Sequence, residues 1–273
     1  MIIQHNMVSA NTNRQLGITN TNLAKSSEKL SSGYRINRAA DDAAGLAISE
    51  KMRSQVRGLQ RASDNAQDGI SLIQTAEGAM DTQHAILQRT RELIVQASNT
   101  GTMEGNGDTD VAKIQVEIEN LKEEFERINT DTEFNKKKLL DSNGAYSTQW
   151  LQLGANKEQG IEVTITAVDW TLNNLSDSDG KANSALLDEV DNMIQKLSVE
   201  RSNLGAYQNR LEYTVKVDDN TAENLQAAES RIRDVDMAEE MTRYSKDSIL
   251  QQAAQSMLAQ ANQATQGVLS LLR

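Results

Sequence analysis

The residues that could perform acid–base or metal chemistry are few in this chain and lie far apart. Histidine occurs only at His5 and His84, and cysteine does not occur. A thiolate zinc site and a disulfide framework are therefore excluded, and no motif of a metalloprotease, serine hydrolase or nucleotide-binding loop is present. His84 falls on a heptad position of a long helical pattern, so we expect a packed, hydrogen-bonded side chain. The sequence predicts no catalytic residue, no cofactor and no metal.

Two acidic segments could attract a cation, and each has a simpler interpretation. The segment EGNGDTD (104–110) lacks the ligand spacing and the closing glutamate of a calcium loop, so we interpret it as a solvated turn. Asp41 and Asp42 come directly before a helical pattern, where carboxylates stabilise the positive end of a helix. Neither segment is predicted to be a binding site.

The composition narrows the class of protein further. The 273 residues include 28 Lys and Arg against 39 Asp and Glu, which gives a net charge of −11. Such an acidic chain is not expected to bind nucleic acid or an anionic membrane. No apolar run is long enough to span a membrane, and the first residues lack the features of a secretory signal. The protein is therefore expected to stay in the cytoplasm or to leave by a route that does not read such a signal.

Heptad patterns in three long stretches predict that the chain is mainly α-helical. Apolar residues recur at spacings of four and three over 52–94, 114–128 and 190–232. Three glycines follow the first stretch, so we expect its helix to end near Asn99 and to form an antiparallel hairpin with the second. The third stretch keeps its frame across Asn220, which favours one continuous helix. These stretches predict a long antiparallel helical bundle or coiled coil.

The middle of the chain changes from a helical period to a period of two. Apolar residues alternate between Gln149 and Ile165, around a turn region at 154–160, which predicts one small β-hairpin near 149–168. The flanking segments are polar and rich in turn residues. We therefore expect a variable tip near 141–184.

The two ends of the chain are polar and carry only isolated apolar residues. Residues 1 to about 40 and about 236 to 273 are rich in Asn, Gln, Ser, Thr and Ala. Neither end has enough apolar area to offset the ordering cost of roughly 1 to 2 kcal/mol per residue. Each end therefore needs a partner, which is either the other end or other copies of the chain.

Several segments of this sequence resemble bacterial flagellin. They are KLSSGYRIN, NRAADDAAGLAISEKMRSQVRGLQRASDNAQDGISLIQTAEGAM, QRTRELIVQASN, TEFNKKKLL, AAESRIRDVDMAEEM and MLAQANQATQGVLSLLR, in the order that the family has them. The resemblance covers about residues 1–140 and 185–273. Only about 40 residues stand where the family has its outer domains, so the chain resembles a short flagellin that lacks them.

The resemblance implies a domain layout and a function. Residues 1–42 would pair with 235–273 as a terminal coiled-coil domain in the inner filament, and 43–234 would form a helical bundle domain. The chain would be a structural subunit, exported unfolded without a cleaved signal peptide, that folds as it polymerises into the extracellular flagellar filament for motility. The implied partners are other copies, a flagellin export chaperone, the flagellar type III export apparatus, hook-associated and cap proteins, and toll-like receptor 5.

The resemblance also implies two sets of interaction residues. Arg89, Leu93 and Glu117 match the family's contact positions for toll-like receptor 5, or serve subunit packing, and Gln88 and Gln96 lie in the same segment. The polymerisation and chaperone segment would use the apolar residues of the last 25 positions, which are Ile249, Leu250, Met257, Leu258, Val268, Leu269, Leu271 and Leu272.

Two other classes of protein are considered. A hook–filament junction protein shares the helical ends and stays the alternative. An enzymatic flagellin would need a metallopeptidase insertion in the middle of the chain, and the middle segment here is short and has no histidine. We therefore expect no enzymatic activity.

Overall fold

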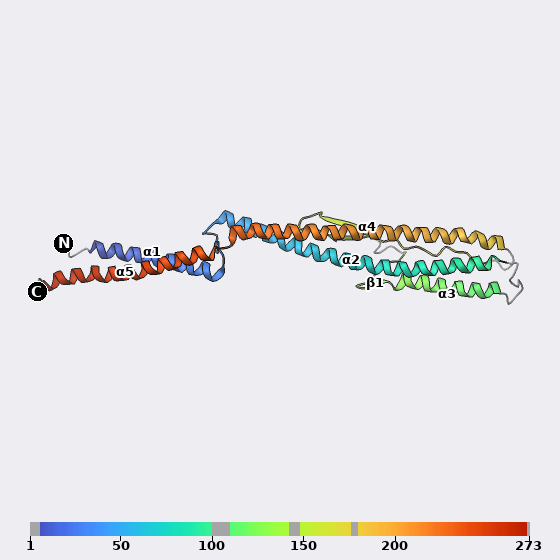
Figure 1. Cartoon of the computed structure of the whole chain (residues 1–273), viewed down its shortest axis with the longest axis horizontal. Helices are drawn as coiled ribbons and strands as arrows, with labels where there is room; N and C mark the ends of the chain where they lie inside the picture. The colour runs from blue at the N-terminus through green and yellow to red at the C-terminus, as the bar shows by residue number, and fades with distance from the viewer. Residues whose placement is uncertain (1–5, 100–109, 142–147, 176–179, 272–273) are drawn as a thin grey trace. The chain divides into compact units, whose positions relative to one another are not determined.

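The computed structural model describes residues 6–99, 110–141, 148–175 and 180–271, with side chains described as far as Gln263. These residues are mainly α-helical, as predicted (Figure 1). The described helices are α1 (Met7–Ser32), α2 (Ala43–Ala97), α3 (Asp110–Asp131), α4 (Gly180–Arg233) and α5 (Met237–Leu271). The predicted end of the first long helix near Asn99 and the continuous helix across Asn220 are both confirmed.

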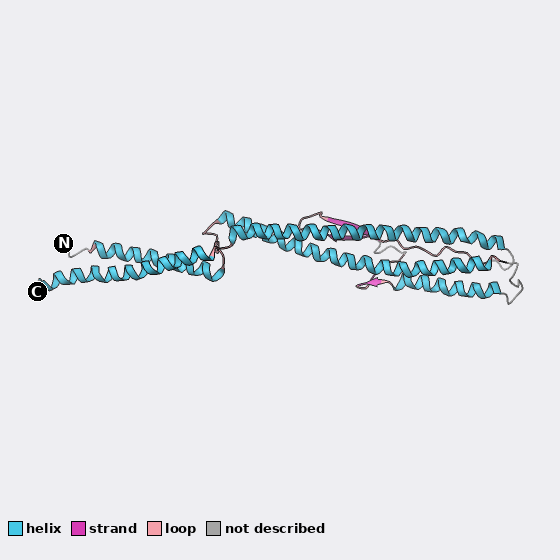
Figure 2. Ribbon diagram, viewed as in Figure 1, coloured by secondary structure: helices cyan, strands magenta, loops and turns pink. Residues whose placement is uncertain are grey.

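Two antiparallel strand pairs lie between the helices in the described part of the chain (Figure 2). The predicted hairpin is formed by β3 (Thr148–Gln152) and β4 (Gly160–Thr164), in the register that pairs Leu151 with Ile161. A second pair, β1 (Glu133–Phe134) with β2 (Lys137–Lys138), was not predicted. Strands of two residues are too short to leave a period in the sequence.

The chain forms two compact units, whose limits lie within α2 and α4. Unit 1 comprises Met1–Val56 with Glu223–Arg273, and unit 2 comprises Arg57–Ala222. Helices α2 and α4 each contribute residues to both units. The predicted limits after residues 42 and 234 fall instead where α2 begins and α4 ends, and they stay a prediction about layers in an assembly.

Unit 2 is a three-helix bundle whose polar contacts show its register. Ser63 of α2 hydrogen-bonds Asp219 of α4 at 3.0 Å, and Arg91 of α2 pairs with Asp191 of α4 at 2.8 Å. Since the partner number falls as the α2 number rises, α2 and α4 are antiparallel. The unit encloses a continuous apolar core, of which the large fully buried side chains are Ile73, Met80, Leu87, Leu93, Ile94, Phe125, Leu140, Ile165, Met193, Leu197, Leu204 and Leu211.

Unit 1 contains α1 and α5, which lie side by side along their lengths (Figure 1). The Asn6 amide donates to the Ala261 carbonyl at 3.1 Å, and Gln251 donates to Asn20 at 2.9 Å. The two helices are therefore antiparallel, and the predicted pairing of the chain ends is confirmed. Among their described side chains, only Ser26 and Glu240 are buried, and neither is apolar.

A tyrosine holds the segment that follows α1 in unit 1. Gly33, with φ of 75°, caps α1 in the left-handed conformation that glycine adopts freely. The next residue, Tyr34, forms an isolated β-bridge with Asp234. The Tyr34 ring faces the guanidinium groups of Arg233 at 4.7 Å and Arg53 at 5.8 Å. These cation–π contacts tie the segment to α2 and to the end of α4.

Two helix glycines of α2 should respond in opposite ways to alanine. A Cβ at Gly78 would meet no atom within 4 Å, so Gly78→Ala should raise the free energy of unfolding by about 0.5–1 kcal/mol. A Cβ at Gly69 would lie 2.5 Å from Cδ1 of Leu151, so Gly69→Ala should lower it. Chemical denaturation followed by circular dichroism measures both. Equal effects of the two variants would contradict the observed packing of β3 on α2.

A buried carboxylate in α4 predicts an unusual pH dependence. Burial, with a smaller contribution from neighbouring Asp219, raises the pKa of Asp218, and its Oδ2 has no hydrogen-bond partner among the described residues. Because the folded-state pKa exceeds the unfolded one, the charged form destabilises the fold once the pH rises through the folded-state value. Asp218→Asn should therefore raise the thermal midpoint at pH 7, and the gain should shrink toward pH 4. Asp188→Asn, at an exposed position of α4, is the matched control; a pH-independent gain would contradict the explanation.

Candidate interaction surfaces

The residues that suggested chemistry in the sequence have structural roles. His84 is half-buried and its Nε2 lies 2.9 Å from Nε2 of Gln88, so the predicted packed, hydrogen-bonded histidine is confirmed. Residues 104–109 of the acidic loop lie outside the described residues. Across the described part of the chain, no group of His, Asp and Glu side chains could hold a metal ion, and no helix is long and apolar enough to cross a membrane.

Asp41 and Asp42, which directly precede α2, accept hydrogen bonds from different segments. The Asp42 carboxylate accepts a hydrogen bond from the Gly45 N–H at 2.8 Å and caps the helix, as predicted. The Asp41 carboxylate instead accepts from the N–H groups of Arg38 and Asn37, so its hydrogen bonds lie in the loop and do not cap the helix. The bond from Arg38 is the main cause that lowers the pKa of Asp41. Asp41 closes the loop before the helix.

The terminal helices of unit 1 expose the apolar side chains that were expected to mediate polymerisation. In α5, Ile249 is 66% exposed and Met257 is 57% exposed, with Leu250 also exposed and Leu258 half-buried. The side chains of Val268, Leu269 and Leu271, and the whole of Leu272, lie outside the described residues. The described part of α5 thus presents a row of unburied apolar groups.

Sequence reasoning missed further members of this surface. Met7, Val8 and Ile18 of α1 are exposed, as are Met237 and Met241 of α5. The sequence signal for these residues was weak. Each is an isolated apolar residue in an otherwise polar helix, without other apolar residues at heptad spacing beside it. The two helices together form a surface that the monomer leaves uncovered.

The net charge of the chain is divided unequally between the units. Unit 1 carries 12 Lys and Arg against 11 Asp and Glu, a net charge of +1. Unit 2 carries 16 against 28, a net charge of −12. The surface with exposed apolar groups is therefore almost neutral, and apposing copies there meets little electrostatic repulsion.

A charged patch on unit 2 contains most of the predicted receptor-contact residues. The Arg89 guanidinium of α2 pairs with Glu117 of α3 at 2.9 Å and with Glu92 at 3.2 Å, contacts that raise its pKa, with Glu117 as the main cause. Gln88 and Gln96 are exposed on the same helix. The structure thus brings Arg89 and Glu117 together on one surface, although they lie 28 positions apart.

Leu93 differs from the other residues of that patch. Its side chain is 2% exposed and belongs to the core of unit 2, together with Ile94. Leu93 does not lie on the heptad seam through Leu87 and Ile94. It belongs to a second buried stripe of α2, at helical spacing with Ile86, Thr90 and Ala97. In this conformation Leu93 supports the surface from below and does not present its side chain to a partner.

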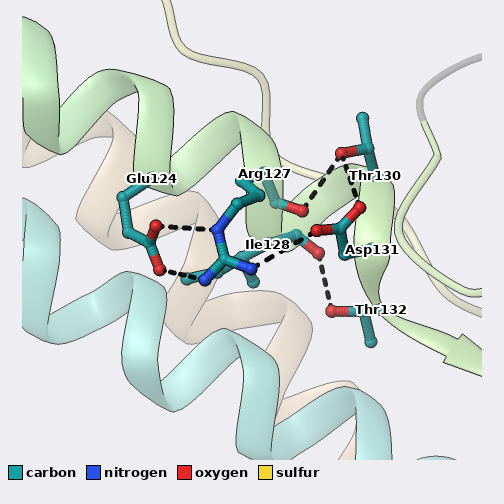
Figure 3. A network of polar contacts seen from close by, with 6 residues as sticks. All are labelled: Glu124, Arg127, Ile128, Thr130, Asp131 and Thr132. Carbon is teal, nitrogen blue, oxygen red and sulfur yellow. Dashed lines mark hydrogen bonds and ion pairs between the residues drawn. The ribbon is translucent and has the colours of Figure 1, made fainter.

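Polar contacts fix the end of α3 (Figure 3). The Arg127 guanidinium donates to both carboxylate oxygens of Glu124, at 2.6 and 2.8 Å, and reaches Asp131 at 3.3 Å. The Thr132 hydroxyl donates to the Ile128 carbonyl at 2.6 Å. The same Ile128 carbonyl also accepts from the Thr132 N–H at 3.1 Å, so backbone and side-chain bonds together hold the last turn of α3, and β1 begins at Glu133.

Comparison with known proteins assigns the chain to a family. Residues 3–145 match the family model of the bacterial flagellin N-terminal helical region, and residues 187–272 match that of the C-terminal helical region. A flagellin of Halalkalibacterium halodurans is 54% identical and one of Bacillus subtilis is 49% identical, each over the whole length of both chains. A flagellar filament 33 kDa core protein of Treponema phagedenis is 50% identical, again over the whole of both chains. The chain therefore belongs to the bacterial flagellin family, whose members are structural proteins, not enzymes, that self-polymerise into the flagellar filament outside the cell.

Proposed function

We propose that unit 1 completes its folding only when copies of the chain assemble. The observation that carries the proposal is that α1 and α5 bury no apolar side chain among those described, while Met7, Ile249 and Met257 are more than half exposed. Full burial of one such side chain stabilises by about 1.5–3 kcal/mol. Repeated over several positions of α1 and α5, this gain offsets the cost of ordering the helices, so folding and polymerisation become one process.

The same surface supports export in an unfolded state. A chain whose ends order only in the polymer stays extended inside the cell, with its exposed apolar groups held by a flagellin export chaperone that binds the C-terminal segment. The flagellar type III apparatus then carries the chain out without a cleaved signal peptide. Outside the cell, cap and hook-associated proteins present the first surface on which α1 and α5 dock.

The charged patch of unit 2 is the proposed contact for toll-like receptor 5. Arg89 and Glu117 hold each other in fixed positions at half-exposed sites, and Gln88 and Gln96 add exposed amides. An ordered, partly exposed arginine is a frequent hot spot in protein interfaces. The patch can also serve packing between subunits in the filament, since a surface hidden there is free in the released monomer.

Removing the last part of α5 should separate folding of unit 2 from assembly. A chain without residues 251–273 should keep the cooperative thermal melt of the α2–α4 bundle, because the core residues of unit 2 lie before Glu223. It should form no filaments and bind no export chaperone. Electron microscopy of concentrated protein with preformed seeds detects filaments. Co-purification with the chaperone measures chaperone binding.

Substitutions in the full-length chain test the same surface without shortening α5. Ile249→Ser combined with Met257→Ser should block filament formation, whereas Gln255→Ser, at an exposed polar position of the same helix, should not. Filaments from the truncated chain would refute the proposal. A full chain that polymerises only on a preformed hook would instead favour the junction-protein alternative.

The receptor proposal is tested on the exposed pair, because truncating Leu93 would also damage the core. Arg89→Ala and Glu117→Ala should each lower the affinity for toll-like receptor 5 about tenfold, as expected for a hot spot. Arg127→Ala, which removes an exposed arginine with a carboxylate partner elsewhere on unit 2, is the control. Surface plasmon resonance with the receptor ectodomain gives the affinities; unchanged binding by both patch variants would remove the receptor claim.

A further inference from the structure

A tight hairpin after α3 presents three consecutive lysines on the acidic unit. Strands β1 and β2 are joined by only Asn135 and Lys136, followed by Lys137 and Lys138. Both loop residues have positive φ, 51° at Asn135 and 64° at Lys136. Positive φ at both positions is the pattern of a type I′ turn, for which Asn-Gly is the preferred sequence.

The backbone gives no reason for a lysine at the tip of this turn. At φ of 64° a glycine is unstrained, whereas a residue with a Cβ adopts the left-handed region at a cost in free energy. Lys136 is exposed, and within the described ranges it makes no ion pair. The end of α3 just before it is fixed by the Arg127 contacts (Figure 3), so the lysines are held at a defined place.

A groove on the same unit has the opposite charge. It lies between α3 and the segment 170–174, has a volume of about 330 Å³, and is lined by Glu119, Glu123 and Glu126 against a single cation, Lys122. Glu119 accepts a hydrogen bond from Gln115, and Lys122 lies 3.8 Å from Glu126. Glu123 is exposed and pairs with no residue whose side chain is described.

An aromatic ring completes the groove. Trp170 lines it, half-buried, and its ring packs edge-on against the buried Phe125 with centroids 5.5 Å apart. This contact fixes the orientation of the indole. An indole face next to carboxylates attracts an ammonium group by cation–π interaction as well as by charge.

We propose that, in the filament, the lysine hairpin 135–138 of one copy docks into the Glu119–Glu123–Glu126 groove of a neighbouring copy. The inference rests on the proposed polymerisation and names one contact within it. Hairpin and groove are different surfaces of one unit, so the contact is heterologous and can repeat without closing, as an open helical polymer requires. It also places the most concentrated positive charge of unit 2 against a neighbour whose unit 2 carries −12.

Charge exchange across the contact is the direct test. Lys136→Glu and Glu123→Lys should each raise the critical concentration for seeded polymerisation about tenfold at about 50 mM NaCl, and the double variant should return to within about threefold of the unmodified chain. At about 500 mM NaCl the single-variant effects should fall below about threefold, because salt screens exposed charges. Lys157→Glu, which reverses an exposed lysine at the turn between β3 and β4, is the matched control and should change the value less than about twofold.

A second variant separates docking from damage to the hairpin. Lys136→Gly should raise the thermal midpoint of the monomer by about 2–4 °C, because glycine suits the turn. It should still raise the critical concentration about threefold, since the tip charge is lost. Normal assembly by Lys136→Glu, failure of the double variant to recover, or an equal effect of Lys157→Glu would each overturn the inference. An unmodified chain that forms no filaments would instead refute the proposed polymerisation itself, a result visible before any variant is compared.

Discussion

The structure depends on one constraint, which is that α1 and α5 pair without burying an apolar side chain among those that are described. A helix in water gains most of its stability from packing an apolar face rather than from its own propensity. In unit 2 that condition is met inside the chain, because the seams of α2, α3 and α4 enclose a continuous core. In unit 1 the described side chains of the terminal helices bury only Ser26 and Glu240. In the proposed assembly, other copies supply the missing apolar burial.

This constraint explains how charge and composition are distributed. A surface on which copies stack is best kept near neutrality, and unit 1 carries a net charge of only +1. Unit 2 instead carries a net charge of −12, and a net charge of one sign opposes the association of like copies in solution. The absence of proline fits both units, since a proline within α2, α4 or α5 would break a helix of 35 residues or more.

The sequence predicted those parts of the fold in which a periodic apolar pattern packs against another segment of the same chain. The seams through Met80 and Leu204, the end of α2 and the β3–β4 hairpin all follow from periodicity and turn residues. The β1–β2 hairpin was missed because two-residue strands have no period, and its turn uses Lys136 where a glycine would have signalled it. The exposed row on α1 was missed because a sparse apolar pattern has its partner outside the chain.

The candidate surfaces were predicted less completely than the fold, for a related reason. Family resemblance pointed to Arg89, Leu93 and Glu117, and three-dimensional packing then separated them, with Arg89 and Glu117 paired at the surface and Leu93 in the core. A one-dimensional motif gives the residues of a contact but not the face on which each lies. The roles of Asp41 and Asp42 diverge in the same way, since only hydrogen-bond geometry tells a helix cap from a loop closure.

Amide hydrogen exchange, compared between monomer and filament, tests the central claim most directly. If unit 1 completes its folding on assembly, the amides of α1 and α5 exchange quickly in the monomer and become protected in the filament, while those of α2 to α4 within unit 2 are protected in both. Terminal helices that are already as protected in the monomer as the core of unit 2 would contradict the account.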